Sequence, residues 1–351
     1  MAAYTTIDDP EAYFQVKLYT GTGSEIAVTL DGDTNMQPDF VWTKNREQDD
    51  GHQIFDAVRG VTKFLRTNNT DAESTDAQTL KSFDSDGFTV GTYEDMNTSN
   101  EGVVAWCWKA GGSTASNTTG DITSTVSVNS TAKFSIVSYT GNGTANQTVG
   151  HSLGVTPDLI IIKNRDRAVL WPVINPKFVS VSDTNMLYLA SNAAEADDTN
   201  IQGTNAHSST IFGVDDYTGV NVNTEKQIAY CWASVQGFSK FGVYTGNGNA
   251  NGGYIHLGFR PAFLMVKCLE KVDDWFMVDN KRDPHNVMAG RLQPNSSGAE
   301  VTTTNWCDFT ANGFKWRSAT AQLNEASKTF IYAAFAEAPF VNSEGVPCNA
   351  R

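Results

Sequence analysis

Three nearly identical turns, YTGTG at Tyr19–Gly23, YTGNG at Tyr139–Gly143 and YTGNG at Tyr244–Gly248, punctuate this chain of 351 residues. Gly and Asn suit such turns because they tolerate backbone conformations with positive φ. One copy would say little about the fold. Three copies, spaced by a little over 100 residues, indicate a structural unit that is repeated along the chain.

Other landmarks recur in the same order after each turn. The segment PDFVWTKN at Pro38–Asn45 returns as PDLIIIKN at Pro157–Asn164 and, more loosely, as PAFLMVKC at Pro261–Cys268. Each unit then closes on an apolar segment that ends in an aromatic residue: Val104–Trp108, Ile228–Trp232 and Ile331–Phe335. Runs such as Leu159–Ile162 are apolar at every position, which is typical of strands between two packed layers.

Short strands joined by polar turns are typical of antiparallel sandwiches. We therefore predict an all-β protein of three tandem antiparallel β-sandwich repeats, jelly-roll-like and about 100 residues each. The alternative is a six-bladed propeller with two blades per unit, but no half-unit repeat is evident. The predicted division is an N-terminal arm at 1–13, repeat 1 at 14–110, a Ser/Thr-rich linker or hairpin at 111–133, repeat 2 at 134–236, repeat 3 at 237–340 and a C-terminal arm at 341–351.

Composition excludes several classes of function. The net charge of −14 would repel a phosphate backbone, so we expect no nucleic-acid partner. No apolar run is long enough for a membrane helix, and Met1–Phe14 shows no basic and apolar leader. Five cysteines without a C-x-x-C motif argue against a disulfide framework or a zinc site. Cys107 and Cys231 lie in matching apolar segments, so we expect buried reduced thiols.

The search for catalytic residues gives only weak candidates. Adjacent carboxylates occur as Asp49/Asp50, Asp197/Asp198, Asp215/Asp216 and Asp273/Asp274. A glycosidase needs two carboxylates held apart across a sugar, one of them with a raised pKa, and neighbouring Asp residues in polar loops do not provide this by default. Five scattered histidines lack ligand spacing, and His52 stands where the other repeats have Trp171 and Trp275, which indicates packing. We predict no catalytic residue and no cofactor.

Asp84 and Asp86 have the spacing that opens a calcium loop, and they are the weak candidates for a metal site. The acidic residue that closes an EF-hand loop is missing, and the matching hairpin of repeat 3 reads Thr310–Gly313 (TANG). A β-turn alone accounts for both hairpins. We therefore predict a turn at Asp84–Gly87 rather than a metal ligand set.

Tryptophan rings could stack on sugars, which makes them candidates for a binding surface. Most of the tryptophans named above occupy matched positions and are expected in the cores of the repeats. Trp306 and Trp316 are unmatched in the other repeats. They are the candidates for surface binding, although core positions are favoured for them too.

Four motifs together resemble a known family. They are the YTGNG turn, the P-D-x₄-K-N-R strand at Pro38–Arg46 and Pro157–Arg165, FDSDGFTVG at Phe83–Gly91, and the ending AEAPFVNSEGVPCNAR at Ala336–Arg351. Through these motifs the chain resembles structural proteins of marine tailed phages that are named as tail-fibre proteins. The resemblance extends over residues 14–351. The middle repeat departs from the family at its hairpin, Thr210–Val214.

The resemblance implies a non-enzymatic structural virion protein, a tail-fibre or receptor-binding component, assembled in the host cytoplasm. It implies as partners further copies of the chain, with a homotrimer as the first expectation, other virion proteins, and a host-surface glycan or protein. The alternatives are a capsid decoration protein, a carbohydrate-degrading tailspike enzyme and a sugar-binding module. Because the two arms have no sandwich of their own to complete, we expect a neighbouring subunit or virion protein to hold them.

Overall fold

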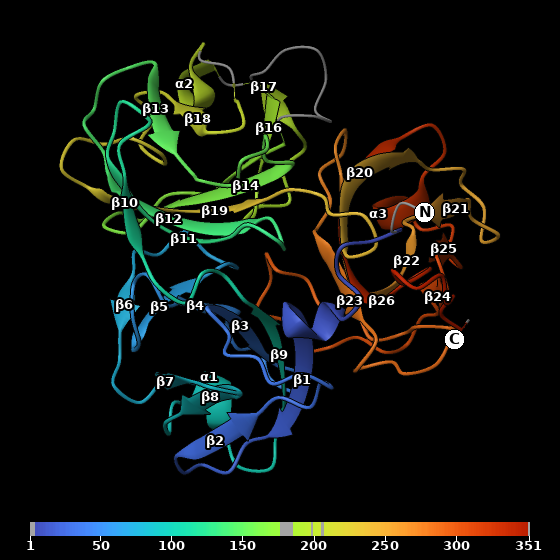
Figure 1. The fold of residues 1–351 in the computed structure, drawn as a ribbon. Helices are drawn as coiled ribbons and strands as arrows, with labels where there is room; N and C mark the ends of the chain where they lie inside the picture. The colour runs from blue at the N-terminus through green and yellow to red at the C-terminus, as the bar shows by residue number, and fades with distance from the viewer. Residues whose placement is uncertain (1–3, 176–184, 198, 205–206, 350–351) are drawn as a thin grey trace.

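Apolar segments of the chain pair as antiparallel strands throughout the computed structural model, which describes residues 4–175, 185–197, 199–204 and 207–349 (Figure 1). The prediction of an all-β fold is confirmed, and the paired sheets have the character of β-sandwiches. None of the helices in the described part of the chain has the length and apolarity needed to cross a bilayer.

The first sandwich follows a short 3₁₀ helix, η1 (Pro10–Ala12), and includes one helical turn, α1 (Glu94–Asn97). The larger sheet contains, in spatial order, β1 (Phe14–Thr20), β9 (Gly102–Trp108), β3 (Phe40–Asn45), β4 (Gln53–Asp56), β5 (Lys63–Arg66) and β6 (Ser74–Thr75). The smaller sheet contains β2 (Ile26–Thr29), β8 (Gly87–Val90) and β7 (Leu80–Asp84).

The second sandwich has the widest sheet, because the Ser/Thr-rich linker contributes two strands to it. In spatial order this sheet contains β10 (Ala115–Asn117), β11 (Ser124–Asn129), β12 (Phe134–Thr140), β19 (Lys226–Trp232), β14 (Leu159–Asn164), β15 (Pro172–Ile174), β16 (Asn185–Tyr188) and β17 (Ala196–Asp197). Its smaller sheet pairs β13 (Gln147–Gly150) with β18 (Ile211–Val214), and α2 spans Thr199–Gln202.

The third sandwich is narrower. Its larger sheet contains β20 (Ser239–Thr245), β26 (Thr329–Pro339), β22 (Phe259–Cys268) and β23 (Phe276–Asp279). Its smaller sheet contains β21 (Tyr254–His256), β25 (Gly313–Trp316) and β24 (Cys307–Thr310), and α3 spans Ala321–Asn324.

The closing aromatic residue of each sandwich has the same register. Trp108 pairs with Phe14 and Phe40, at the positions where Trp232 pairs with Phe134 and Leu159. Phe335 pairs in the same way with Ser239 and Phe263. These registers agree with the sequence alignment of the three units. The number of repeats and their limits stay predictions.

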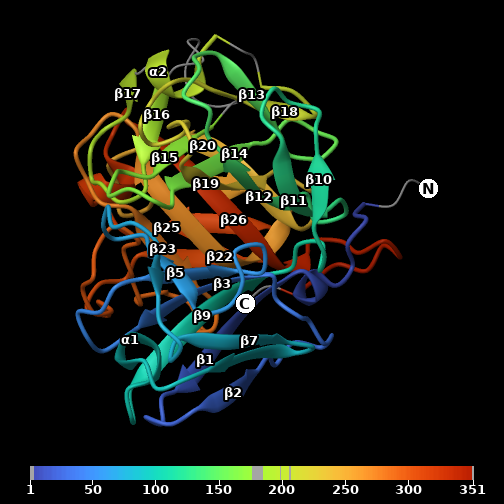
Figure 2. The ribbon, with the colours of Figure 1, turned by 90° about the vertical axis from the view of Figure 1, so that its left-hand side faces the viewer.

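Four apolar cores explain why strands such as Leu159–Asn164 are apolar on both faces. One core lies inside each sandwich, between its larger and smaller sheets. The fourth, called here the shared core, forms where the larger sheets of all three sandwiches meet (Figure 2). There the Trp108 ring lies 6.3 Å from the Trp232 ring and 5.4 Å from the Phe335 ring, measured between centroids.

Backbone hydrogen bonds join the sandwiches in a closed cycle around the shared core. The N–H of Glu73 donates to Arg165 O of the second sandwich at 2.7 Å. Equivalent bonds run from Glu195 N to Leu269 O at 2.7 Å and from Glu300 N to Arg46 O at 2.8 Å. The three acidic residues are equivalent in the sequence, where they end the corresponding segments DAE at 71–73, AAE at 193–195 and GAE at 298–300. The three sandwiches therefore contact one another head to tail, and their orientation is fixed.

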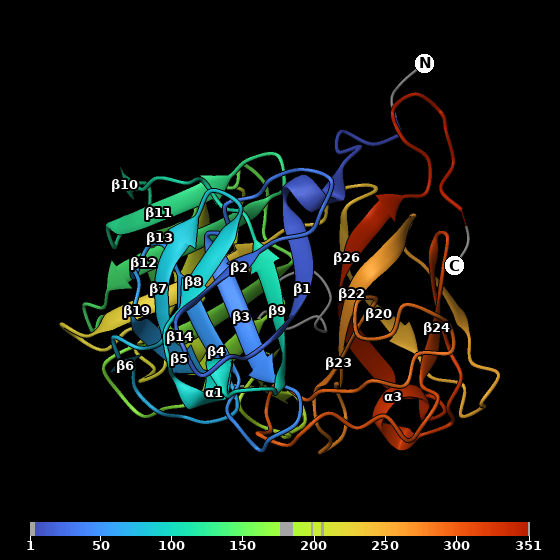
Figure 3. The same ribbon diagram turned by 90° about the horizontal axis from the view of Figure 1, so that it is seen from below.

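The described parts of both arms are held by the chain itself, which corrects the expectation that a neighbouring protein must hold them. Ile7 is 2% exposed and belongs to the shared core, and Thr5 donates its hydroxyl to Gln236 O at 2.8 Å. The C-terminal arm lies beside the N-terminal one, where Ser343 N donates to Asp8 Oδ1 at 2.6 Å (Figure 3).

Candidate functional site

The repeated turn is anchored by a buried asparagine that the sequence analysis did not single out. In the second sandwich the side chain of Asn221, which is fully buried, accepts the N–H of Asn142 at 2.9 Å and donates to Thr144 O at 2.8 Å. The Tyr139 hydroxyl donates to Val220 O at 2.7 Å. In the first sandwich Asn97 accepts the N–H of Thr22 and the Tyr19 hydroxyl donates to Met96 O, and in the third Asn324 accepts the N–H of Asn247 and the Tyr244 hydroxyl donates to Leu323 O. The three asparagines lie at the same distance in sequence before the closing aromatic residue, which is the signal that could have identified them.

The two glycines of the turn are required for different structural reasons. A Cβ on Gly141 would lie 2.3 Å from Val222 O, which leaves no room for a side chain. Gly143 has a φ of 66°, in the left-handed region that favours glycine. The Asn between them closes a side-chain turn, because Asn142 Oδ1 accepts the N–H of Thr144 at 2.9 Å. The residues of the repeated motif are therefore explained by the backbone conformation of the turn in each sandwich.

A lysine is also buried at the same position of each sandwich. Lys44, Lys163 and Lys267 are fully buried, and their ammonium groups donate to backbone carbonyls of the loop that follows the strand. Burial away from water lowers the pKa of each lysine to about 8, against the effect of nearby carboxylates. These lysines shape the loops, and their Nζ atoms are not presented to solvent.

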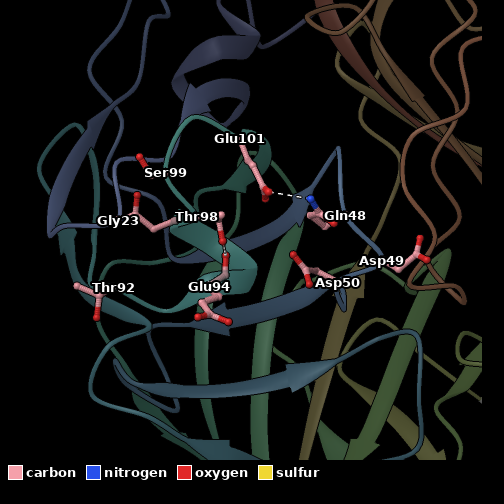
Figure 4. A pocket seen from close by; sticks show the side chains of 10 residues that line it. Gly23, Gln48, Asp49, Asp50, Thr92, Glu94, Thr98, Ser99 and Glu101 are labelled. Atoms are coloured by element: carbon pink, nitrogen blue, oxygen red, sulfur yellow. Dashed lines mark hydrogen bonds between the residues drawn. The ribbon is translucent and has the colours of Figure 1, made fainter.

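A cluster of four carboxylates borders the first turn. A pocket of about 660 Å³ is lined by Gly23, Gln48, Asp49, Asp50, Thr92, Glu94, Asn97, Thr98, Ser99 and Glu101 (Figure 4). The loop after β3 supplies Asp49 and Asp50, and the segment from α1 to β9 supplies Glu94 and Glu101. The pocket can attract cations or amines, because four of its side chains are acidic.

Two of these carboxylates share one donor. The Asn45 amide donates to Asp50 Oδ2 at 2.8 Å and to Glu101 Oε2 at 2.5 Å, and Gln48 Nε2 donates to Glu101 Oε1 at 2.8 Å. Desolvation, helped by the nearby charge of Asp95, raises the pKa of Asp50. A carboxyl with a raised pKa beside a second carboxylate is the pair that acid–base chemistry on a sugar needs. No aromatic side chain lines this pocket, however, so it offers no face for stacking a sugar ring.

Comparison with known proteins identifies the family. The model of a domain of unknown function, DUF7483, matches residues 9–339. The chain belongs to the DUF7483 family. No curated protein and no solved structure matches it. Membership therefore covers all three sandwiches but assigns no activity to them.

In this DUF7483 chain, Asp84 and Asp86 serve the β7–β8 hairpin. Asp84 accepts the hydroxyls of Ser82 and Thr89 at 2.7 and 2.8 Å, and Asp86 accepts the N–H of Met36 at 3.1 Å. No group of three or more His, Cys, Asp or Glu side chains among the described residues is placed to hold a metal ion. Both aspartates therefore have structural partners of the kind that a turn provides.

The remaining carboxylate candidates are dispersed. Asp49 accepts the N–H of Ala299, and Asp215 accepts the N–H groups of Asn146 and Asp216. Asp273 accepts the N–H of its neighbour Asp274. Asp198 and the side chain of Asp197 lie outside the described residues. Among the candidates, only Asp49 and Asp50 line the acidic pocket.

The two unmatched tryptophans are core residues, which corrects their proposal as surface-binding candidates. Trp306 is 6% exposed and Trp316 is fully buried, and both belong to the core of the third sandwich. Their rings contact Phe276 with centroid distances of 5.4 and 5.8 Å. The two tryptophans have no counterparts in the other sandwiches because the core of the third sandwich contains more aromatic rings.

His52 is a packing residue, as the sequence alignment predicts. It is fully buried and accepts the indole N–H of Trp42 at 3.0 Å, and its ring stacks on Trp106. Burial lowers its pKa well below the usual value. Trp171 and Trp275, at the equivalent positions, each donate an indole N–H to a carbonyl of the neighbouring sandwich, at 3.2 and 3.0 Å.

Proposed function

We propose that this chain is a non-enzymatic structural component of a tailed-phage virion that acts at a tail fibre in attachment to the host surface. The observation that carries the proposal is that the polar residues that recur in the three sandwiches have structural roles. The asparagines of the turns and the buried lysines are bonded to backbone in every sandwich, so what was repeated is a means of building a stable scaffold. The resemblance of its motifs to those of phage tail-fibre proteins suggests the biological setting of the proposal.

The proposed partners are further copies of the chain, a homotrimer first, other virion proteins, and a host-surface glycan or protein. Rigid display suits this role, because the closed cycle of contacts joins each sandwich to the next. Several copies on one particle would then add avidity to weak individual contacts.

Electron cryomicroscopy of phage particles decorated with an Fab against this chain tests the location. Fab density at the distal tail is the expected result, and purified chain should then compete with phage for adsorption to host cells. Periodate treatment of the cells separates a glycan receptor from a protein receptor. Fab density over the capsid shell would instead assign the chain to decoration, and particles without bound Fab would refute the virion role.

The acidic pocket is the specific observation that favours the second candidate, a carbohydrate-degrading tailspike enzyme. Incubation of the purified chain with capsular polysaccharide or lipopolysaccharide should release no reducing ends if the structural role is right. Turnover that is lost in Asp50→Asn and Glu101→Gln, and kept in the neighbouring control Asp49→Asn, would establish the enzyme instead.

A further inference from the structure

The contacts between neighbouring sandwiches, called seams here, differ in their chemistry. The 1–2, 2–3 and 3–1 seams are named after the two sandwiches that meet, and each contains one of the backbone bonds of the closed cycle. Residues 234–237 connect the second sandwich directly to the third along the chain. The weakest seam can be identified because equivalent positions meet at all three.

The 1–2 seam is held by a series of charged side chains. Arg165 of the second sandwich donates to both carboxylate oxygens of Glu73 of the first, at 2.8 and 2.9 Å. Glu73 also pairs with Arg59 at 3.2 Å, and Arg59 pairs with Asp56 at 2.5 Å. The Tyr230 hydroxyl of the second sandwich donates to Asp56 at 2.7 Å. The network therefore crosses the seam at both of its ends.

The 3–1 seam repeats this network with equivalent residues. Arg46 of the first sandwich donates to Glu300 of the third at 2.7 Å. Arg282 pairs with Glu300 at 2.7 Å and with Asp279 at 2.6 Å. The indole N–H of Trp106 donates to Asp279 at 3.1 Å, from the position that the tyrosine occupies at the 1–2 seam. Because hydrogen bonds between charged groups are stronger than those between neutral ones, opening either seam would break strong bonds.

The 2–3 seam lacks the residues that form this network. Leu269 takes the position of the cross-seam arginine, eight residues after the proline that begins the aligned segment. Ala333 takes the position of the aromatic donor, two residues before the closing aromatic residue, and Asn175 takes the position of the aspartate. Leucine and alanine side chains have neither a charge nor a hydrogen-bond donor. Neither of them can therefore form the cross-seam bond of its counterpart.

The bonds that cross the 2–3 seam include three that end on backbone carbonyls. The N–H of Glu195 donates to Leu269 O at 2.7 Å, as part of the closed cycle. Two further bonds run from Asp273 N to Asn192 O at 2.8 Å and from the Trp275 indole to Tyr188 O at 3.0 Å. All three join neutral groups.

The shared core is also packed less tightly at this seam. Ala333 lines two small cavities, of about 20 and 10 Å³, and Leu159 and Met265 line both of them as well. Leu159 belongs to the second sandwich, and the other two residues belong to the third. Side chains beside a void lose the dispersion contacts that a filled core provides. The small side chain of Ala333 thus weakens the seam in a second, independent way.

The chain connection lies at one end of the 2–3 seam and Leu269 lies at the other. Ser239, which follows the connection, pairs with Phe335, and Phe335 pairs in turn with Phe263 near the beginning of β22. Leu269 is six residues beyond Phe263, which places it roughly 20 Å further along the strand. Contacts at the far end can therefore separate while the connection stays in place.

We propose that the cycle of sandwiches opens at the 2–3 seam, by a rotation about residues 234–237, while the 1–2 and 3–1 seams stay closed. The closed form is the ground state, and the open form is a minor state of the kind that local opening produces in native proteins. Opening separates Leu159 from Met265 and Ala333, so the chain then presents an apolar surface that the closed form hides. The inference does not depend on the virion role.

Hydrogen exchange of the full chain, resolved to single amides, measures opening at each seam. The amides of Glu195 and Asp273 report on the 2–3 seam, and those of Glu73 and Glu300 report on the 1–2 and 3–1 seams. We expect the first two to be less protected than the last two by at least about tenfold at pH 7. Equal protection at the three seams would overturn the proposal.

A thiol placed in the seam distinguishes opening from the unfolding of a sandwich. Ala333→Cys puts a cysteine beside the two cavities, whereas the native Cys231 and Cys307 lie in the cores of the second and third sandwiches. Labelling with N-ethylmaleimide, located by peptide mass spectrometry, should modify the thiol at position 333 at least about tenfold faster than either native thiol. Labelling of all three at one rate would show that a sandwich unfolds instead, which would overturn the proposal.

Arg165→Leu transfers the leucine of the 2–3 seam to the 1–2 seam. Because Glu73 keeps its ion pair with Arg59, the variant leaves no carboxylate without a partner. Exchange at the Glu73 amide should rise toward that of Glu195, whereas the Glu300 amide should be unchanged. An unchanged Glu73 amide in the folded variant would mean that the charged network does not hold the seams, which would overturn the proposal.

The matched control is Arg167→Leu, at an exposed arginine whose partner, Glu225, belongs to the same sandwich. It should leave the exchange of all four reporting amides unchanged. Circular dichroism confirms that each variant is folded. If a variant does not fold, the comparison of the seams by hydrogen exchange in the unmodified chain decides.

Discussion

Replacing Asn221 with alanine tests whether the repeated turn owes its shape to the buried asparagine. The substitution removes three hydrogen bonds: from Asn142 N to the side chain at 2.9 Å, and from the side chain to Thr144 O at 2.8 Å and to Asn142 Oδ1 at 3.2 Å. Each bond contributes about 0.5–1.5 kcal/mol net. Because Asn221 is fully buried, water cannot replace them from inside, and we expect a loss of about 2–4 kcal/mol in the free energy of unfolding.

The matched control is Asn223→Ala, two residues away and exposed to solvent. It should change the free energy of unfolding by no more than ~0.5 kcal/mol. Urea denaturation followed by tryptophan fluorescence gives both values from the midpoint and slope of each curve. If Asn221→Ala were as stable as Asn223→Ala, Asn221 would not stabilise the turn, and the glycines alone would define its shape.

Three further outcomes follow from the cores and from a buried histidine. Trp232→Ala should lose ~3–5 kcal/mol of stability in urea denaturation, because it empties part of the shared core; an unchanged midpoint would contradict this. Residues 237–340 expressed alone should be aggregated or poorly folded by gel filtration and circular dichroism, since their shared-core face would be exposed; a monomeric folded fragment would refute it. His151 accepts the N–H of Leu153 at 3.1 Å, and burial lowers its pKa to about 4, so the unfolded chain binds the proton more readily and stability falls on acidification. From pH 7 to pH 5 this residue should account for a loss of ~2 kcal/mol, which His151→Gln removes and the exposed His285→Gln keeps.

Local features were predictable from the sequence because they depend on neighbours along the chain. The turns require glycine, and strands such as Leu159–Asn164 need two apolar faces, so both leave a pattern in the residues themselves. The shared core leaves no separate pattern, since an apolar face looks the same whether it meets its own sandwich or another. The position of the arms was missed for the same reason, because a single residue, Ile7, enters a core built from distant segments.

The candidate sites show where single-sequence reasoning is weakest. Trp306 and Trp316 were singled out because they are unmatched between repeats, but an unmatched aromatic residue can equally fill a core that differs in shape. The acidic pocket was missed as a unit because Glu101 lies far in sequence from Asp50, and only the pairing of β3 with β9 brings their loops together. Asparagine at a constant distance before the closing strand was visible but carries no chemistry of its own.

A single chain that closes three sandwiches into a ring can let each of them diverge, which three identical subunits could not do. The edges illustrate this: a loop covers β1 and the linker strand β11 covers β12, whereas none of the described strands pairs with the outer edge of β20. In a symmetric trimer an open edge would appear three times and would bind three partners. A single chain can instead treat each edge separately, so its three sandwiches differ in the surface that they present.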